Sequence, residues 1–342
     1  MAKVVSERVY KGVKALAVFD NYFVGAKGYR LYNYYFDSEG KREYVGRVVD
    51  RKYSFFSKFK LTRRFMRAEV NGLYYLPDGS RLIIARKGVF RCEAGEKKFY
   101  KCFDVKRGSR PMNLCVTPSG EIYFGEYFAN MGKSAVNIYT SKDGGKSWYV
   151  AYTFAEGNIN HIHGLYWDKY TESIWVVTGD RENECVIGYT KDGFQTLNIV
   201  FRGGQEYRSC VLFFYPDSVV YATDSQYIKN EIKCFNRTTH EISVVQAVQG
   251  SVIKGTQCGD VALISTAVEP SDVNLDKNAY VWFSTDGTNW EQIYQGTKDC
   301  LPSIFQFALF ETPQYYTSTS KYAVFSGRAV KGVDGTTILK EL

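Results

Sequence analysis

The chain has 342 residues, with 44 basic and 36 acidic side chains and a formal net charge of +8. It lacks an apolar run of about 20 residues that could span a membrane, and its charged first 15 residues leave no room for the apolar part of a secretory signal. We therefore expect a cytoplasmic protein with no membrane partner. Its basic residues are scattered apart from one short run, Lys58–Arg67, so we expect no nucleic acid partner either.

The composition favours short strands over helices. Aromatic residues make up 16% of the chain, Pro is scarce at 7, and Gly is plentiful at 30, as expected of many strands joined by glycine turns. The 8 cysteines are spread singly, without a C-x-x-C pair, and several lie in apolar strand patterns. We expect them to be buried free thiols.

Turn-like segments recur along the chain with a period near 47 residues. From Ser141 to Thr190 is 49 residues, and from Thr190 to Ser284 is 94, or twice 47. Such a period is typical of repeat folds. In chain order the turns are Asp37–Gly40, Cys92–Gly95, Ser141–Trp148, Thr190–Leu197, a turn near residue 237 within Phe235–Val245, Ser284–Trp290 and Lys331–Gly335.

Three of these turns share a motif. Residues 141–148 (SKDGGKSW) match S-x-D-x-G-x-[ST]-W at every position, residues 284–290 (STDGTNW) are one residue shorter, and residues 190–197 (TKDGFQTL) are degenerate. The Asp carboxylate accepts backbone N–H groups within the turn, a Gly takes a positive φ, and the Trp packs beneath the hairpin. The motif therefore predicts a structural turn, with Asp143, Asp192 and Asp286 away from any ligand.

Each period contains four strand patterns. An inner strand a, such as residues 161–168 (HIHGLYWD), leads to an apolar strand b, such as 173–180 (SIWVVTGD); strand c precedes the turn and strand d follows it. The last period lacks a strand d, and Val4–Tyr10 is predicted to supply it. We predict an all-β fold, a single domain of residues 1–342 forming a seven-bladed β-propeller of four-stranded antiparallel blades, with the ring closed by the N-terminal strand.

These turns and their spacing resemble the sialidase-like (BNR/Asp-box) β-propeller superfamily. The resemblance covers the repeat framework along most of the chain. It implies a propeller fold but not one activity, because this framework carries sialidases, other glycosidases, polysaccharide lyases and non-catalytic receptors. The chain has no F/Y-R-I-P segment, and the sialidase arginine clamp and Tyr–Glu pair are not found by motif.

In a propeller, the starts of a strands and the ends of b strands emerge on the same face. Ionisable residues occupy these positions in nearly every period, which predicts a charged binding funnel. The a-strand starts supply Arg67, Glu69, Arg110, His161, His163, Arg208 and Lys254. The b-strand ends supply Arg86, Glu126, Asp180, Arg181, Asp224, Glu269 and Arg328.

The funnel residues divide into two groups by chemistry. Imidazoles and carboxylates are candidate catalytic acids, bases or nucleophiles, whereas guanidinium groups suit a sugar carboxylate and tyrosines stack on sugar rings. The catalytic candidates are His161, His163, Glu126, Asp180 and Asp224. The substrate-binding candidates are Arg208, Tyr207, Tyr127, Arg110, Arg181, Glu269 and Arg67. A metal would need a third ligand beside His161 and His163, and no other His lies nearby in the sequence; an Asp or Glu could complete such a site, but we expect no metal and no other cofactor.

The sequence favours an enzyme that cleaves glycosidic bonds in an acidic, uronic- or sialic-type oligo- or polysaccharide. Hydrolysis would use two of the four carboxylates Glu126, Asp180, Asp224 and Glu269 and is slightly favoured. β-Elimination would use His163 or a Tyr as base, with Arg208 neutralising the substrate carboxylate. The alternative from another class is a non-catalytic glycan- or protein-binding propeller, whose rim charges would pair among themselves.

Overall fold

A computed structural model describes residues 6–38 and 40–342. The chain is nearly all β and divides into two compact units. One unit is residues 46–210; the other combines the described residues up to Val45 with Val211–Leu342. The predicted single domain of residues 1–342 stays a prediction.

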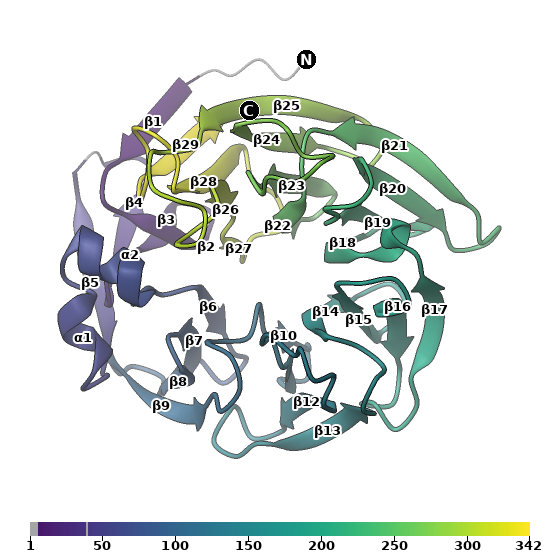
Figure 1. The fold of residues 1–342 in the computed structure, drawn as a ribbon. Coiled ribbons are helices and arrows are strands. Elements are labelled where there is room, and N and C mark those ends of the chain that lie inside the picture. Colours follow the sequence, from purple (N-terminus) through teal and green to yellow (C-terminus); the bar gives the residue numbers. More distant parts are fainter. Residues whose placement is uncertain (1–5, 39) are drawn as a thin grey trace. The chain divides into compact units, whose positions relative to one another are not determined.

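The unit of residues 46–210 contains three antiparallel groups of four strands, each in sequence order (Figure 1). They are β6 (Gly72–Tyr75), β7 (Arg81–Ala85), β8 (Gly88–Cys92) and β9 (Lys98–Asp104); β10 (Cys115–Val116), β11 (Ile122–Gly125), β12 (Val136–Ser141) and β13 (Tyr149–Phe154); and β14 (His161–Asp168), β15 (Ser173–Gly179), β16 (Cys185–Thr190) and β17 (Asn198–Gly203). β9 also pairs in parallel with the last residues of β5, Arg47 and Val48.

The other unit contains four such groups. Two of their strands, β5 and β18, each have some residues in one unit and some in the other. The groups are β2 (Lys14–Val18), β3 (Tyr22–Lys27), β4 (Arg30–Tyr35) and β5 (Arg42–Val48), extended by β27 (Gln314–Tyr315); β18 (Ser209–Phe214), β19 (Ser218–Thr223), β20 (Asn230–Asn236) and β21 (Ile242–Val248); β22 (Val252–Cys258), β23 (Val261–Thr266), β24 (Asn278–Ser284) and β25 (Trp290–Thr297); and β26 (Leu309–Glu311), β28 (Tyr322–Arg328), β29 (Thr337–Glu341) and β1 (Ser6–Tyr10).

The last of these groups is completed by the N-terminal strand. β1 pairs antiparallel with β29, with Ser6 opposite Glu341 and Tyr10 opposite Thr337. This pairing confirms the predicted origin of the missing strand; Val4 and Val5 lie outside the described residues. β29 thereby pairs on both sides, with β28 and with β1, and β1 becomes the edge strand of that group.

The motif turns have the predicted local structure. Asp143 lies between β12 and β13, where its carboxylate accepts the backbone N–H groups of Lys146 (3.0 Å) and Ser147 (2.9 Å). Trp148 donates its indole N–H to the Gly145 carbonyl, and Gly145 has a φ of 89°. Asp192 and Asp286 lie in the equivalent β16–β17 and β24–β25 turns.

Apolar side chains from neighbouring strands form the core between these groups. In the unit of residues 46–210, Ile138, Ile162, Val176 and Val186 are each at most 1% exposed and belong to one cluster. Five of the eight free cysteines are buried as well. The strands are therefore fixed by apolar packing, which leaves the polar residues at their ends to form a site.

Two sequence expectations are wrong. Lys331–Gly335 lies between β28 and β29, the second and third strands of its group, and is not a turn between third and fourth strands. The chain also has two short helices, α1 (Tyr53–Phe56) and α2 (Lys60–Met66), that the all-β prediction did not include, and α2 holds Lys60, Arg63 and Arg64 of the basic run. Arg67 ends α2 in a left-handed conformation (φ 51°) and does not begin strand a, because β6 starts only at Gly72.

Candidate functional site

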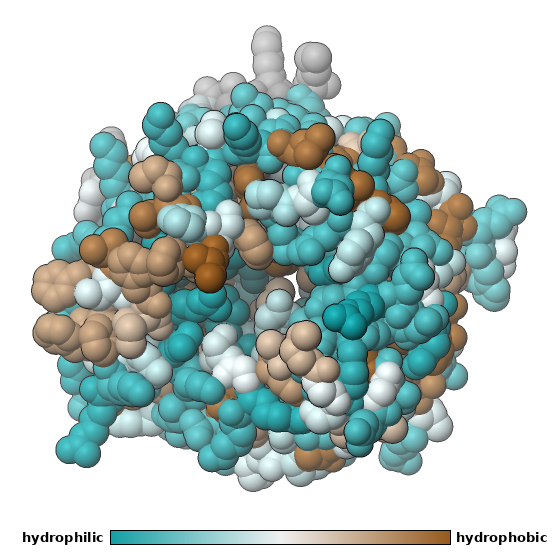
Figure 2. All heavy atoms as spheres, in the orientation of Figure 1, coloured by the Kyte–Doolittle hydropathy of each residue, from teal (hydrophilic) through white to brown (hydrophobic). Residues whose placement is uncertain are grey.

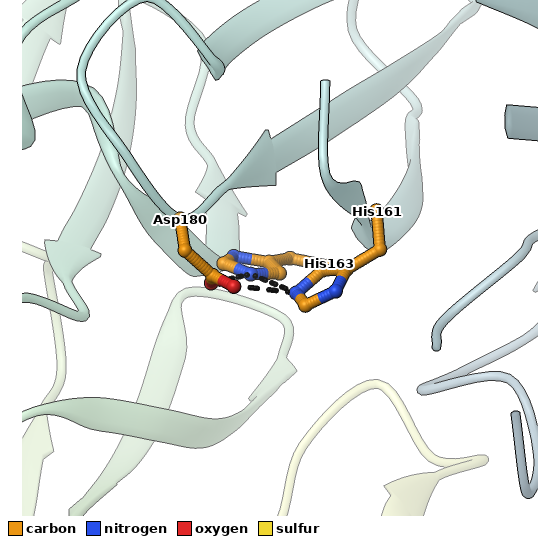
Figure 3. A group of neighbouring side chains, drawn as sticks. All are labelled: His161, His163 and Asp180. Atoms are coloured by element: carbon orange, nitrogen blue, oxygen red, sulfur yellow. Dashed lines mark hydrogen bonds and ion pairs between the residues drawn. The ribbon is translucent and has the colours of Figure 1, made fainter. Parts of the chain in front are cut away.

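The site forms where β14 begins and β15 ends. His161 is the first residue of β14 and pairs with Gly179, the last residue of β15. The register shifts between Ile162 and Gly164, so His163 occupies a bulge. A bulge re-aims a side chain, and both imidazoles turn toward the residue that follows β15, Asp180 (Figure 3).

Three nitrogens converge on one oxygen of Asp180. The Oδ1 atom lies 3.3 Å from His161 Nε2, 3.2 Å from His163 Nε2 and 3.1 Å from an Arg208 Nη2. The two Nε2 atoms are themselves 3.1 Å apart. The three ligand-type atoms of His161, His163 and Asp180 thus face one another at nearly equal separations (Figure 3).

Further hydrogen bonds hold Asp180 and Arg208 in place. Asn160 donates its amide to the second oxygen of Asp180 at 2.7 Å. Arg208, immediately before β18, and Gln205 both donate to the Asp180 carbonyl, at 3.2 and 2.8 Å. The chain after Asp180 is fixed by Glu184, whose carboxylate accepts the N–H of Arg181 at 3.1 Å.

The hydrogen-bond partners fix the proton on one nitrogen of each imidazole. His161 Nδ1 lies 3.0 Å from the Phe128 carbonyl oxygen, and His163 Nδ1 lies 3.0 Å from the Ser209 carbonyl oxygen. A carbonyl oxygen only accepts, so both Nδ1 atoms carry hydrogen. In the neutral imidazoles, both Nε2 lone pairs then face each other and the Asp180 carboxylate, an arrangement that needs a cation or a proton between them.

Burial and charge shape the protonation of this cluster. Burial alone would raise the pKa of Asp180, but the hydrogen bonds that His161 and His163 donate in their protonated form, together with the charges of that form, outweigh it and hold that pKa well below its usual range. Burial lowers the pKa of His163, and the charges of His161 and Arg208 lower it further, against the opposing effect of Asp180. Asp180 is therefore an anion at neutral pH and cannot act as a general acid.

The cluster fits a divalent cation. Two imidazole nitrogens and one carboxylate oxygen are a donor set that suits first-row metals, and three protein ligands leave positions open for a substrate. Metal-binding histidines usually donate their other N–H to a carbonyl or carboxylate, as both do here. The sequence expectation was of no metal, with an Asp or Glu as the residue that could complete such a site, and the structure places Asp180 beside both histidines.

A second group lies beside this cluster, at the end of β11. Glu126 is 8% exposed. It forms an ion pair with Arg107 and accepts a hydrogen bond from the backbone N–H of Asn137 at 2.9 Å. The next residue, Tyr127, is half-buried and its ring lies 4.2 Å from that of His161. Arg107, Glu126 and Tyr127 line a small pocket that opens to solvent, with a cavity volume of about 10 Å³, or room for one water molecule.

The structure brings together only part of the predicted set. His161, His163, Asp180 and Arg208 meet, with Glu126 and Tyr127 in the same unit, but His161, His163 and Arg208 are at most 6% exposed, where an open funnel was expected. Tyr207 stacks on Phe201 at 4.9 Å, Arg110 is half-buried ahead of β10, and Arg181 is exposed beside Asp180. Asp224 and Glu269 belong to the other unit, where Gln226 donates to Glu269 at 2.5 Å.

Sequence reasoning missed the polar residues that support this cluster. Asn160 and Gln205 carry no motif, and Arg107 lies in a loop, outside the strand-end positions that were searched. Asn160 immediately precedes a predicted site strand, and that position was a usable signal. In the other unit, Glu311 at the end of β26 was also missed; it pairs with Lys14, Lys254 and Arg328.

No family model matches the chain, and no curated protein matches its sequence. Solved structures do match. An oligogalacturonate lyase in complex with manganese is 9% identical with a TM-score of 0.59, covering 98% of this chain and 90% of its own. A GH74 enzyme from Niastella koreensis is 12% identical with a TM-score of 0.55, covering 83% of this chain and 46% of its own. The nidogen of a nidogen/laminin complex is 9% identical at 0.52.

These matched structures are β-propellers, so the chain has a β-propeller fold. At such low identity the likeness carries no activity. No sialidase-like family is shown by the comparisons, so that resemblance rests on the turn motifs alone.

Proposed function

We propose that this protein binds an acidic glycan at the Asp180 cluster and cleaves it by β-elimination. The observation that carries the proposal is the convergence of His161, His163 and Arg208 on one Asp180 oxygen. Two matched structures are named as carbohydrate-active enzymes, one of them a lyase in complex with manganese. We also propose that the propeller has seven blades, because one unit contains three groups of four strands and the other contains four.

Elimination fits the protonation of the site better than hydrolysis does. Glycoside hydrolysis needs a carboxylic acid that keeps its proton until the leaving group departs. The pKa of Asp180 is held low by hydrogen bonds from His161 and His163, and Glu126 is paired with Arg107. The slight preference for hydrolysis in the sequence is therefore reversed.

In the elimination, a base removes the proton from the sugar carbon beside the carboxylate. The glycosidic oxygen leaves from the next carbon and takes up a proton from solvent water, and a C=C bond conjugated with the carboxylate remains. Tyr127, acting as the phenolate, is the proposed base, because it is half-buried at the pocket and contacts His161. Both histidines are nearly covered and have both nitrogens engaged.

Two positive groups are available for the substrate carboxylate: the Arg181 side chain and a cation bound at Asp180. Arg181 follows Asp180 and is exposed, and the Asp180 side chain, at 29% exposed, can be reached from solvent. A divalent cation held by His161, His163 and Asp180 would supply positive charge that acidifies the proton beside the carboxylate. Arg208 pairs with Asp180 and positions the Asp180 carboxylate; it does not contact the substrate itself.

The test is incubation of the protein with uronic-acid oligosaccharides, with Mn²⁺ or with a chelator. We expect unsaturated product, detected by its ultraviolet absorbance, in the presence of Mn²⁺ and about 100-fold less with His163→Ala. His240→Asn, which removes the exposed third histidine, is the control. New reducing ends without unsaturated product would make the enzyme a hydrolase and overturn the elimination.

Non-catalytic glycan binding is the second candidate. The specific observation in its favour is that the charges of His161, Asp180 and Arg208 pair among themselves and are largely covered. The same incubation decides between the two: oligosaccharide binding by calorimetry, without unsaturated product or new reducing ends, would establish binding alone.

A further inference from the structure

The helical segment of residues 51–67 carries an unusual surface. It has seven basic residues and no acidic one, in the sequence RKYSFFSKFKLTRRFMR. Its helices α1 and α2 present large apolar side chains to solvent, and in the space-filling view tan and brown atoms gather over the place of these helices (Figure 2). The exposed apolar residues are Phe55 (59%), Phe59 (57%), Leu61 (59%) and Phe65 (43%).

The aromatic rings of this segment pack on one another. Phe55 lies 6.0 Å from Phe59, edge to face, and 5.8 Å from Phe56. The basic residues surround them: Lys58 and Lys60 are exposed, and the ammonium group of Lys58 lies 5.9 Å from the Phe55 ring. Apolar and cationic groups therefore occupy the same small surface.

We propose that this surface docks on an anionic lipid membrane. Aromatic and leucine side chains on a basic segment are what interfacial attachment requires, because the apolar groups enter the acyl boundary while the cations meet anionic headgroups. The excess of positive charge selects an acidic occupant. The exposed phenylalanines favour a lipid surface over a nucleic acid, whose backbone is read by charge and hydrogen bonds.

This attachment differs from spanning a membrane. The residues that the structure describes contain no helix long and apolar enough to cross one. The expectation of no membrane partner rested on the same lack of a spanning run and does not address a surface contact. The segment ends 59 residues before Glu126 in the sequence and includes none of the residues of the Asp180 cluster that carries the proposed activity, so the two proposals stand independently.

The experiment is co-sedimentation of the full chain with vesicles of phosphatidylcholine alone or with added phosphatidylserine. We expect binding only to the anionic vesicles, weakening as salt rises because screening shortens the reach of the charges. Phe55→Ser combined with Phe59→Ser should weaken binding at least tenfold. Leu275→Ser combined with Ile304→Ser, which removes two apolar residues elsewhere that are even more exposed (78% and 82%), should leave binding unchanged.

A second pair of variants tests the charges. Lys58→Gln with Lys60→Gln should weaken binding about tenfold or more, since each lysine near the headgroups contributes. Lys146→Gln with Lys191→Gln removes the same charge from exposed positions in two motif turns and should not weaken it. Equal binding to neutral vesicles, or binding by the serine variant at wild-type strength, would overturn the proposal. So would tight binding of duplex DNA that survives the serine substitutions while no vesicle binds.

Discussion

Two buried clusters of charge, one in each unit, differ in what they can bind. In the unit of residues 46–210, the Asp180 carboxylate meets two imidazoles and Arg208. In the other unit, Glu311 (side chain 5% exposed) meets Arg328 at 2.6 Å, Lys14 at 3.5 Å and Lys254 at 3.6 Å. Both clusters lie at strand ends, so topology alone does not separate them.

The difference lies in the donor atoms. Neutral imidazole nitrogens have lone pairs, so the Asp180 cluster can accept a cation. Ammonium and guanidinium groups have no acceptor and stay charged. The cations that pair with Glu311 offer no lone pair to a ligand, so this cluster serves as an ion-pair brace, whereas the Asp180 cluster is suited to chemistry.

The largest expected effect comes from neutralising Asp180. Asp180→Asn removes the charge that faces both imidazoles, and we expect the loss of Mn²⁺ binding and of glycan cleavage by about 100-fold or more. Calorimetric titration and the unsaturated-product assay measure the two losses. Glu311→Gln should keep both properties in the folded protein. If Asp180→Asn retained full activity, the Asp180 cluster would be a brace like the other.

Neutralising Glu311 should instead reduce stability. Glu311→Gln leaves Lys14, Lys254 and Arg328 facing one another without this carboxylate, and breaking a buried ion cluster in this way costs about 3 kcal/mol. Urea denaturation measures the free energy of unfolding, with the exposed Glu241→Gln as control. A variant more stable than the wild type would show that desolvation of these charges outweighs their attraction.

The space around the imidazoles is as specific as their charge. A Cβ atom at Gly179 would lie 2.6 Å from His163 Cε1 and 3.2 Å from Arg208 Cγ. Gly179→Ala should push His163 off its position, costing about 1–3 kcal/mol and weakening Mn²⁺ binding about tenfold. Gly132→Ala, where no atom lies within 4 Å of the added Cβ, is the matched control. Unchanged Mn²⁺ binding would show that the cluster tolerates displacement.

The sequence predicted the framework better than the site. Period and turn chemistry identified the motif turns of Asp143, Asp192 and Asp286, and the pairing of β1 with β29, because each rests on local patterns or on counting strands. The Asp180 cluster was only partly predictable. The i, i+2 spacing of His161 and His163 was visible, but the bulge and the support from Asn160 arise from tertiary packing.

The helices were missed for a related reason. Residues 53–66 mix aromatic and basic residues, and the aromatic residues favour strands by propensity. The segment connects β5 to β6 between two repeat turns, where the period predicts no particular residue pattern. Burial also could not be foreseen: Arg208 was expected at an open rim, whereas the carbonyl of Asp180 and its carboxylate hold it in the interior.

The motif turns should contribute to stability without affecting the site. Asp143→Ala removes hydrogen bonds from Lys146, Ser147 and Ser141 and should cost about 1–2 kcal/mol. The exposed Glu156→Ala should cost nothing measurable. Thermal denaturation and glycan binding together test this separation, and a stable Asp143→Ala variant that cannot bind glycan would assign the turn to the site.

The smallest effect is the pH dependence of the same turn. Burial would raise the pKa of Asp143, but hydrogen bonds from the Ser147 side chain and backbone, with others from Ser141 and Lys146, lower it from 3.8 to about 2. Because the folded pKa lies below the unfolded one, the carboxylate stabilises the fold above pH 4, and this contribution disappears as the pH falls toward 2. The difference in urea midpoint between wild type and Asp143→Asn should therefore shrink between about pH 5 and pH 2. Glu156→Gln should show no such trend, and a constant difference for Asp143→Asn would mean that the turn needs the shape of the side chain and not its charge.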